Sequence, residues 1–226
     1  MPFDKVKPNS PVMIPDPLQQ HLQALFGAAG HVVTLTELPL DLLLLNEQQC
    51  ASPFSPEQVD TIWQNMPYWA FVWSSGAALA RYVSDHPEAV AGKRIVDFGA
   101  GSGVVGLAAL KAGASSVCLC DIDPLALQAG QFNAELNGVS VTTALSLDEV
   151  GEFDLLLVGD ILYDTRNHDL ANTLFTQGKP LLWAESRAQT KLSHHGPIAH
   201  YAAETQPNIG GFDEHTQIHI YQHQPV

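Results

Sequence analysis

The amino-acid sequence predicts an α/β fold built on a seven-stranded, mostly parallel sheet with helices on both faces, preceded by an N-terminal helical extension. From residue 94 onward, short apolar segments alternate with helical ones, which is typical of parallel βαβ units. These apolar segments are almost uninterrupted, and this pattern indicates strands that are buried on both sides. The last two expected strands have no helix between them, so we expect an antiparallel hairpin at the edge of the sheet.

The composition is that of a globular protein with an acidic surface. Apolar residues make up 46% of the 226 residues and charged residues 15%, which excludes a disordered chain. The formal net charge of −14 opposes binding to phosphate backbones, so we expect no nucleic-acid partner. A basic protein or a cationic small molecule would suit such a surface, although the charge can equally serve solubility alone.

The sequence contains no segment that predicts export or insertion into a membrane. The first residues, MPFDKVKPNSP, have no apolar core of signal-peptide length. The leucine-rich run at 38–45 is too short to cross a bilayer and contains Pro39 and Asp41. Three cysteines give no disulfide framework, and we expect Cys118 and Cys120 on one face of a buried strand. We therefore expect a cytoplasmic protein without a membrane partner.

Residues 1–88 are expected to form turns and helices that pack on a core domain comprising residues 89–226. Ser55 followed by Pro56 is typical of a helix start. We expect helices at 77–83, 104–112, 124–136 and 169–175, and strands at 94–98, 116–120, 139–145, 153–158, 180–184, 200–205 and 216–222. A sheet with this alternation is Rossmann-like, and such sheets bind their ligands at the carboxyl ends of the strands.

A glycine-rich segment follows the strand at 94–98 and opens the next helix. Gly99, Gly101 and Gly103 alternate here, and their missing Cβ atoms let the backbone turn tightly and approach a ligand closely. A plain strand-to-helix turn would need only one glycine. The three together therefore predict a loop that binds a cofactor.

Two kinds of cofactor fit this loop. Gly101, Gly103 and Gly106 also match G-x-G-x-x-G, the fingerprint of dinucleotide binding. Asp97 would then face a negatively charged pyrophosphate at close range, whereas S-adenosyl-L-methionine brings a positive ammonium and a positive sulfonium. The carboxylate therefore favours S-adenosyl-L-methionine as the cofactor.

A second acidic position lies about 20 residues beyond the glycines, at the end of the next strand. Asp121 is placed there to accept hydrogen bonds from ribose hydroxyls, and we expect its neighbour Ile122 to contact the cofactor as well. Asp123 precedes Pro124 and is expected to cap the helix that begins at that proline.

Several segments resemble known motifs. Residues 96–103, Val-Asp-Phe-Gly-Ala-Gly-Ser-Gly, are similar to motif I of the class I methyltransferases, and residues 120–124 are similar to the acidic motif that follows it. Three further segments belong to the resemblance: 67–73 (Pro-Tyr-Trp-Ala-Phe-Val-Trp), 133–138 (Asn-Ala-Glu-Leu-Asn-Gly) and 159–164 (Gly-Asp-Ile-Leu-Tyr-Asp). Together they resemble the seven-β-strand protein-lysine methyltransferases, nearest the electron transfer flavoprotein β-subunit lysine methyltransferases and the nicotinamide N-methyltransferase-like proteins related to them.

The resemblance implies roles for particular side chains. Trp73 would border the cofactor, and Asp160 would lie at the end of the fourth strand, where it would contact the cofactor beside the transferred methyl group. Asp160 and Tyr163 form the Asp-x-x-Tyr pair of the lysine-modifying group, and Asn133 would be a structural residue behind the ribose-binding strand. The chain departs from the family at 184–187, where it reads Ala-Glu-Ser-Arg in place of Gly-Asp-Pro-Gly-Arg.

These patterns predict direct in-line transfer of a methyl group to a substrate nitrogen, without a nucleophilic serine or cysteine. Asp160 would orient the amine by accepting a hydrogen bond, and Tyr163 and Trp69 would wall the aliphatic stem of a lysine. The resemblance makes a lysine-bearing protein the expected substrate, with the electron transfer flavoprotein β subunit as a candidate.

Three other functions stay open at this point. They are methylation of a small amine such as nicotinamide, NAD-dependent oxidoreduction, and cofactor binding without catalysis. We expect no metal site, because no carboxylate or cysteine completes a ligand set with the histidines of the C-terminal region, His194, His195, His215, His219 and His223.

Overall fold

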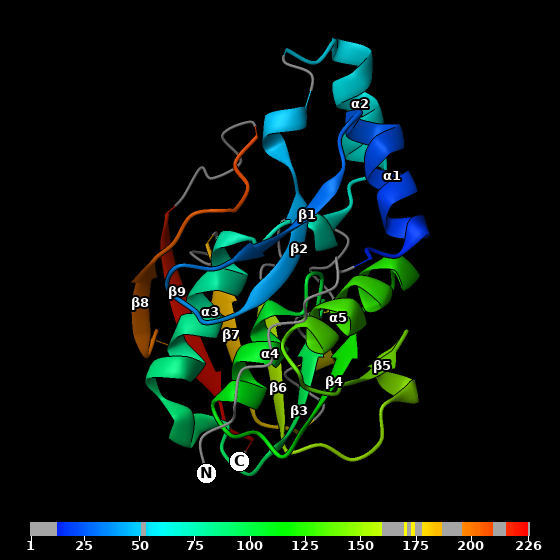
Figure 1. Ribbon diagram of the computed structural model, residues 1–226. Coiled ribbons are helices and arrows are strands. Elements are labelled where there is room, and N and C mark those ends of the chain that lie inside the picture. The colour runs from blue at the N-terminus through cyan, green and yellow to red at the C-terminus, as the bar shows by residue number, and fades with distance from the viewer. Residues whose placement is uncertain are drawn as a thin grey trace.

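A seven-stranded sheet forms the centre of the protein in the computed structural model (Figure 1). The structure describes residues 13–50, 53–159, 170, 173–174, 178–186, 196–209 and 216–225. The strands lie in the order β5-β4-β3-β6-β7-β9-β8. Their bounds are β3 Arg94–Phe98, β4 Ser116–Cys120, β5 Thr142–Ala144, β6 Leu155–Gly159, β7 Leu181–Glu185, β8 Ala199–Ala202 and β9 Gln217–His223.

The sheet is parallel from β5 through β7, and β9 runs antiparallel to both of its neighbours. The predicted fold class, including the antiparallel C-terminal hairpin, is therefore confirmed. Strands β4 and β5 lie on one side of β3, whereas β6 and β7 lie on its other side. The order of the strands thus reverses between β3 and β6, and such a switch point opens a crevice at the carboxyl ends of the strands.

Three helices cover one face of the sheet: α3 Ser74–Asp85, α4 Val104–Lys111 and α5 Pro124–Leu136 (Figure 1). They pack with the side chains of one sheet face in the largest apolar cluster. The side chains of the other face form a separate cluster that includes Trp183, Tyr221 and Leu174. Of the helix expected at 169–175, the structure describes Leu170, Thr173 and Leu174, which are helical, and the other residues lie outside the described part.

The N-terminal region contains helices, as expected, and also a strand pair that the sequence did not predict. The helices are α1 Asp16–Phe26 and α2 Pro56–Gln64, and the strands β1 Gly30–Thr34 and β2 Asp41–Leu45 pair antiparallel. Short 3₁₀ turns occur at η1 Glu47–Gln49, η2 Tyr68–Ala70, η3 Pro87–Ala89 and η4 Leu147–Glu149. The division of the chain at residue 88 stays a prediction.

The strand β2 is buried on both of its faces. Leu42 and Leu44 pack with the helices on the sheet, whereas Leu43 and Leu45 pack with α1 and α5. This double burial explains the leucine-rich run, because a strand covered on both sides needs apolar side chains at every position. None of the helices in the described part of the chain is long and apolar enough to cross a membrane.

The predicted start of a helix at Ser55 is confirmed by a capping box. The hydroxyl of Ser55 accepts from the backbone N–H of Gln58 at 3.3 Å, and the Gln58 side chain accepts from the backbone N–H of Ser55 at 2.9 Å. Two N–H groups that no helical carbonyl can reach are satisfied in this way.

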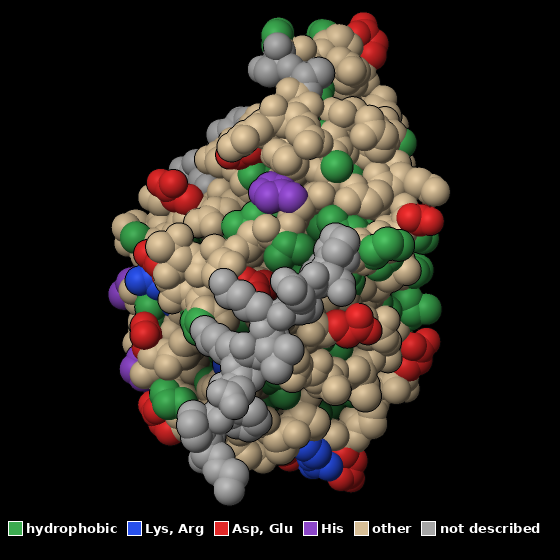
Figure 2. Space-filling model, viewed as in Figure 1, with side chains coloured by type: hydrophobic (Ala, Val, Ile, Leu, Met, Phe, Trp, Pro, Cys, Tyr) green, Lys and Arg blue, Asp and Glu red, His purple; other side chains and the backbone are tan. Residues whose placement is uncertain are grey.

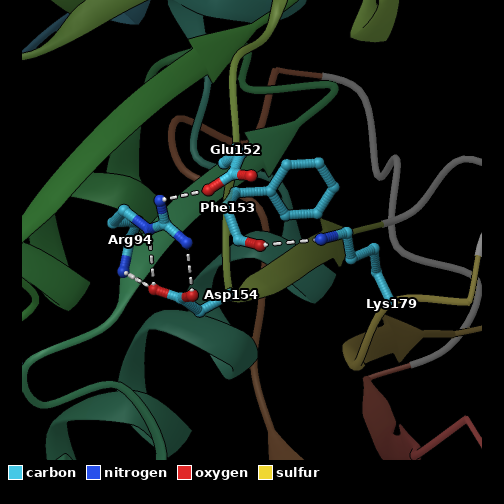
Figure 3. Close-up of polar contacts among 5 residues, drawn as sticks. All are labelled: Arg94, Glu152, Phe153, Asp154 and Lys179. Carbon is cyan, nitrogen blue, oxygen red and sulfur yellow. Dashed lines mark hydrogen bonds and ion pairs between the residues drawn. The ribbon is translucent and has the colours of Figure 1, made fainter.

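An ion-pair cluster fixes β3 against β6 at the amino edge of the sheet (Figure 3). The guanidinium of Arg94 donates to both carboxylate oxygens of Asp154, at 3.1 and 2.8 Å, and contacts Glu152 at 3.2 Å. Hydrogen bonds from Arg94 hold the pKa of Asp154 well below its ordinary value. The cluster lies at the end of the sheet opposite to the carboxyl ends of the strands, and it joins the start of β3 to the residues that precede β6.

Candidate functional site

The glycine-rich loop lies directly after β3, at the switch point of the sheet. Gly99, Gly101 and Gly103 have φ angles of 68°, 51° and 75°. L-residues with a side chain rarely adopt this left-handed region, so the alternating glycines are a backbone requirement. Gly99 is exposed and Gly101 is half-buried, which leaves backbone on the surface for a ligand to approach.

A fourth glycine lets α4 approach the sheet. A Cβ atom on Gly106 would lie 2.8 Å from Val117 Cγ1 and 2.9 Å from Leu119 Cδ2, both on β4. It would also lie 3.1 Å from Asp97 Oδ2. Only glycine allows the first turn of α4 to rest on β4 and on the carboxylate at the same time.

The carboxylate of Asp97 lies beneath the loop, with 3% of the residue exposed. Its Oδ2 accepts a hydrogen bond from the backbone N–H of Gly106 at 2.8 Å. Burial raises the pKa of Asp97 to about 7; the hydrogen bond from Gly106 opposes this rise, and the nearby charge of Asp121 adds to it. A positive charge brought close to Asp97 would favour the ionised form of the carboxylate and would be stabilised by it.

Asp121 holds the loop from the end of β4. Its Oδ2 accepts from the backbone N–H of Gly101 at 2.9 Å, and its Oδ1 accepts from the backbone N–H of Asp123 at 3.0 Å. Burial raises the pKa of Asp121. A carboxylate has about four lone-pair positions, so both oxygens can still accept from the hydroxyls of a ligand.

The neighbours of Asp121 divide into a structural residue and an exposed one. Asp123 caps α5 by accepting from the backbone N–H of Leu125 at 2.8 Å, which confirms the predicted cap. Ile122 is 89% exposed, so this large apolar side chain is presented to solvent beside the loop.

The aromatic segment reaches the same loop from the other side. The indole N–H of Trp73 donates to the carbonyl of Tyr68 at 3.0 Å. That carbonyl oxygen would lie 3.8 Å from a Cβ atom on Gly101. The structure thus brings Trp73 and the loop into one neighbourhood, and the role of Trp73 at the cofactor stays a prediction.

Trp69 belongs to the core. It is fully buried, in a cluster with Phe71 and side chains of α1 and α5. The expectation that Trp69 walls the stem of a substrate lysine does not fit this position, because a wall of an acceptor channel has to reach its surface. Spacing along the sequence could not separate the two aromatic residues, since both lie in one apolar run.

Asn133 connects the loop to the N-terminal hairpin, a link that the sequence did not predict. Its side chain is fully buried, donates to the carbonyl of Ser102 at 2.9 Å and accepts from the backbone N–H of Leu43 at 2.7 Å. Asn137, one turn further along α5, binds both backbone groups of Asp41, at 3.0 and 2.7 Å. The structural role that the resemblance implied for Asn133 is confirmed, and its partner is β2 as well as the loop.

The expected catalytic residues Asp160 and Tyr163 lie outside the described residues, as does Arg187. The last described residue before them, Gly159, ends β6 at the carboxyl edge. Within the described part of the chain, no three His, Cys, Asp or Glu side chains are grouped so that they could hold a metal ion.

The first turn of α4 distinguishes between the two cofactor classes. In dinucleotide-binding folds the pyrophosphate lies on the N–H groups at the start of this helix. Here the N–H of Gly106 is bonded to Asp97, so a pyrophosphate would compete with a buried carboxylate for that donor. A cationic cofactor meets no such conflict.

Comparison with known proteins identifies the family. The family of ribosomal protein L11 methyltransferases (PrmA) matches residues 82–175. The electron transfer flavoprotein beta subunit lysine methyltransferase of Rattus norvegicus is 39% identical over 122 residues, which cover 52% of this chain and 47% of the relative. That of Xenopus laevis is 31% identical over 198 residues, which cover 75% of this chain and 80% of the relative. A solved structure from Pyrococcus horikoshii, assigned as an RNA methyltransferase, has a TM-score of 0.52 at 16% identity over 67% of this chain and 84% of that one, and this likeness shows the fold alone.

The extent of the match differs between these relatives. The chain spans about half the length of the mammalian relatives that it matches, and four fifths of the Xenopus laevis protein. The match to the Xenopus laevis protein identifies the family, and the glycine loop with the carboxylates of Asp97 and Asp121 agrees with it. The chain belongs to the family of electron transfer flavoprotein beta subunit lysine methyltransferases.

Proposed function

We propose that this protein is an S-adenosyl-L-methionine-dependent N-methyltransferase that modifies lysine side chains of a protein substrate. The observation that carries the proposal is the hydrogen bond between Asp97 and Gly106 at the start of α4. It favours a cationic methyl donor over a pyrophosphate at this loop. The relatives named as lysine methyltransferases support the substrate class.

The residues around the loop fit this cofactor. The bare backbone from Gly99 to Gly103 accommodates the methionine part, and Asp121 accepts hydrogen bonds from the ribose hydroxyls. Ile122 offers an exposed apolar surface to the adenine ring. Trp73, which donates to the carbonyl of Tyr68 beside Gly101, borders the site. When bound, S-adenosyl-L-methionine supplies an electrophilic methyl group on a positively charged sulfur.

The side chains of the protein would then position the acceptor and exclude water. Asp160 accepts a hydrogen bond from the substrate amine and orients its lone pair, and Tyr163 lines the aliphatic stem. Exclusion of water lowers the lysine pKa from its ordinary value of about 10.4, so that a larger fraction of the amine is neutral. Positioning of this kind can contribute roughly 7–11 kcal/mol, so no covalent enzyme intermediate is required.

The acidic surface suits a substrate with basic side chains. The chain carries 24 acidic residues against 10 lysines and arginines. Figure 2 shows acidic side chains distributed over one face of the protein, where basic ones are few. The electron transfer flavoprotein β subunit is the candidate substrate, and a small amine such as nicotinamide is the alternative.

Incubation of the protein with methyl-labelled S-adenosyl-L-methionine and purified electron transfer flavoprotein tests the proposal. We expect label on lysine residues of the β subunit, located by mass spectrometry of peptides. Asp160→Ala should lower the rate by about 100-fold or more if Asp160 orients the amine, with cofactor binding retained. Glu88→Ala is the matched control, because this acidic residue is exposed in η3, which precedes the amino end of β3 and thus lies away from the carboxyl ends of the strands.

The same experiment on a cell extract discriminates between the substrate classes. Label that enters only small molecules, with nicotinamide accepted and no protein labelled, would replace the lysine proposal by the small-amine alternative. If S-adenosylhomocysteine does not bind, as judged by calorimetry, the proposed activity is wrong as a whole.

A further inference from the structure

Helix α2 contributes little to the core of the protein. Ile62 is the one buried residue of its nine, all of which the structure describes, whereas α1 buries three of its eleven residues. The start of α2 is nevertheless well formed, with Pro56 at the first helical position and the capping box at Ser55. Because short helices are marginal without tertiary packing, these local features stabilise a helix whose surface is mostly exposed to solvent.

Two apolar side chains of α2 face the solvent. Val59 is 38% exposed and Trp63 is 52% exposed, and because they are four residues apart they lie on one face of the helix. Asp60 lies beside this pair, three residues before Trp63, and Glu57 lies three residues before Asp60; both carboxylates are exposed. We call these four residues the α2 face. An exposed tryptophan beside carboxylates is typical of an interaction site, since its ring offers a large contact area and attracts cations.

The positive charges of the protein lie away from α2. Between residues 13 and 80 the sequence contains acidic residues but no lysine or arginine. In the described part of the chain, the positive side chains are those of Arg81, which is ion-paired, and of four residues that precede or begin β3, β4 and β7 at the amino edge of the sheet: Lys93, Arg94, Lys111 and Lys179. On the face that Figure 2 shows, none of them covers α1 or α2, whose place is marked in Figure 1. A basic partner therefore meets attractive charges at α2 and no lysine or arginine that would repel it.

The position of α2 relative to the glycine loop suits a docking surface. Helices α1 and α2 lie beyond the carboxyl ends of β3 and β4 (Figure 1). The chain leads from Trp63 to Tyr68, whose carbonyl oxygen lies beside Gly101. Five residues span at most about 18 Å, so the Cα atoms of Trp63 and Tyr68 are within this distance of each other. An extended segment of about six residues covers the same distance, so a segment that contacts Trp63 can place a lysine at the loop.

We infer that the α2 face docks a basic segment of the substrate protein, with apolar and cationic side chains of that segment packed against Trp63. This inference rests on the proposed function, because it assumes a protein substrate. Asp60 and Glu57 attract the segment, and the contact with Trp63 contributes most of the affinity. A second copy of this chain fits the face poorly, because a symmetric contact would bring the same carboxylates together.

Steady-state kinetics with purified electron transfer flavoprotein as the methyl acceptor test the inference. Trp63→Ala should raise KM for the flavoprotein about tenfold and leave kcat and the affinity for S-adenosylhomocysteine unchanged. Asp60→Lys should raise KM several-fold at low ionic strength. Added salt should reduce this difference from the wild-type protein, since salt screens exposed charges.

Two control variants make matching changes away from α2. Ile198 is 45% exposed and lies beside the edge strand β8, where its N–H donates to the carbonyl of Ile220. Glu88 is exposed in η3, before the amino end of β3. Ile198→Ala and Glu88→Lys should leave KM unchanged.

The outcomes separate the docking surface from the activity. An unchanged KM in the Trp63 and Asp60 variants, or an equal rise in the controls, would overturn the inference while methylation by the wild-type protein stands. If Trp63→Ala converts a dimer into a monomer in sedimentation and leaves KM unchanged, the face binds a second copy, and the inference is wrong. If Trp63→Ala does not fold, the result for Asp60→Lys decides. If the wild-type protein transfers no methyl group to the flavoprotein, the proposed function fails for this substrate, and the inference fails with it.

Discussion

Asp97 accepts a hydrogen bond through Oδ2 from the backbone N–H of Gly106 at 2.8 Å, and this bond joins the end of β3 to the first turn of α4. The same oxygen would lie 3.1 Å from a Cβ atom on Gly106, so the approach requires a glycine. A buried carboxylate is thus built into the base of the loop. Its titration should be visible both in stability and in binding.

The first prediction concerns stability against pH. Burial raises the pKa of Asp97 from 3.8 to about 7, so between these values the folded protein keeps a proton that the unfolded chain has lost. The contribution of Asp97 to the free energy of unfolding should therefore decrease as the pH rises from 4 to 7, by at most about 1.4 kcal/mol per pH unit. Above pH 7 it should be constant. Urea unfolding of the wild-type protein and Asp97→Asn at several pH values measures the difference. If the stability of the wild-type protein relative to Asp97→Asn rises with pH over this range, or does not change, the pKa of Asp97 is not raised.

The second prediction concerns cofactor binding. A cationic ligand favours the ionised form of Asp97, so below pH 7 binding should release a proton and the affinity for S-adenosyl-L-methionine should increase with pH up to about 7. Asp97→Asn should bind more weakly and lack this dependence. 5′-Methylthioadenosine has no amino-acid group and serves as the control, since its affinity should not follow the titration. Calorimetry from pH 5.5 to 7.5 measures the affinity of the wild-type protein for each ligand and that of Asp97→Asn for S-adenosyl-L-methionine.

Local rules were sufficient to predict the segment from β3 to α5. Each strand there is a short apolar run, and the helix ends are marked by Gly103 at the start of α4 and Asp123 at the start of α5. The loop glycines and Asp121 could be predicted for the same reason, because their roles depend on backbone geometry within a few residues. The third strand was expected at 139–145 and is shorter, Thr142–Ala144, because the pairing with β4 spans only these three positions.

The hairpin of β1 and β2 could not be predicted because its contacts are distant in sequence. Leu43 on β2 is bonded by the side chain of Asn133, 90 residues away. The four buried leucines of β2, residues 42–45, show no alternation of apolar and polar side chains. A short apolar run of this kind fits a buried strand and a helix equally well. The placement of Trp69 in the core likewise depends on α1 and α5, which pack against it only in the folded chain.

The third prediction concerns the link between that hairpin and the loop. Asn133→Ala would leave two buried backbone groups, the N–H of Leu43 and the carbonyl of Ser102, without their side-chain partner. We expect a loss of about 2–5 kcal/mol in the free energy of unfolding, measured in urea. Asn137→Ala is the control on the same helix; its side chain is half-buried, so water can replace its bonds and the loss should be smaller. Similar losses for the two variants would argue against the bridging role of Asn133.

The fourth prediction separates backbone conformation from packing in the loop. Gly103 and Gly138 both have positive φ angles, 75° and 66°. A Cβ atom on Gly138 would meet nothing within 4 Å, whereas one on Gly103 would lie 3.3 Å from Leu119 Cδ1. Gly138→Ala should therefore cost roughly 1–2 kcal/mol for conformation alone, and Gly103→Ala about 1–3 kcal/mol more because α4 must shift. Thermal unfolding gives both values, and equal costs would show that the space beside Gly103 adjusts freely.

The last prediction concerns the segment between β8 and β9, which reaches back to the start of α3. Val72 and Gln206 exchange two backbone hydrogen bonds, at 2.7 and 2.9 Å, and Thr205 Oγ1 accepts from the N–H of Ser74. Thr205→Val keeps the shape of the side chain and removes the acceptor, so we expect a loss of about 0.5–2 kcal/mol in stability, as for other helix caps. Because Trp73 lies between the two anchored residues, the variant should also shift the tryptophan fluorescence and weaken the binding of S-adenosylhomocysteine. Thr205→Ser keeps the hydroxyl and should retain both properties; if instead the valine variant behaves like the wild type and the serine variant does not, the methyl group of Thr205, and not its hydrogen bond, positions this part of the site.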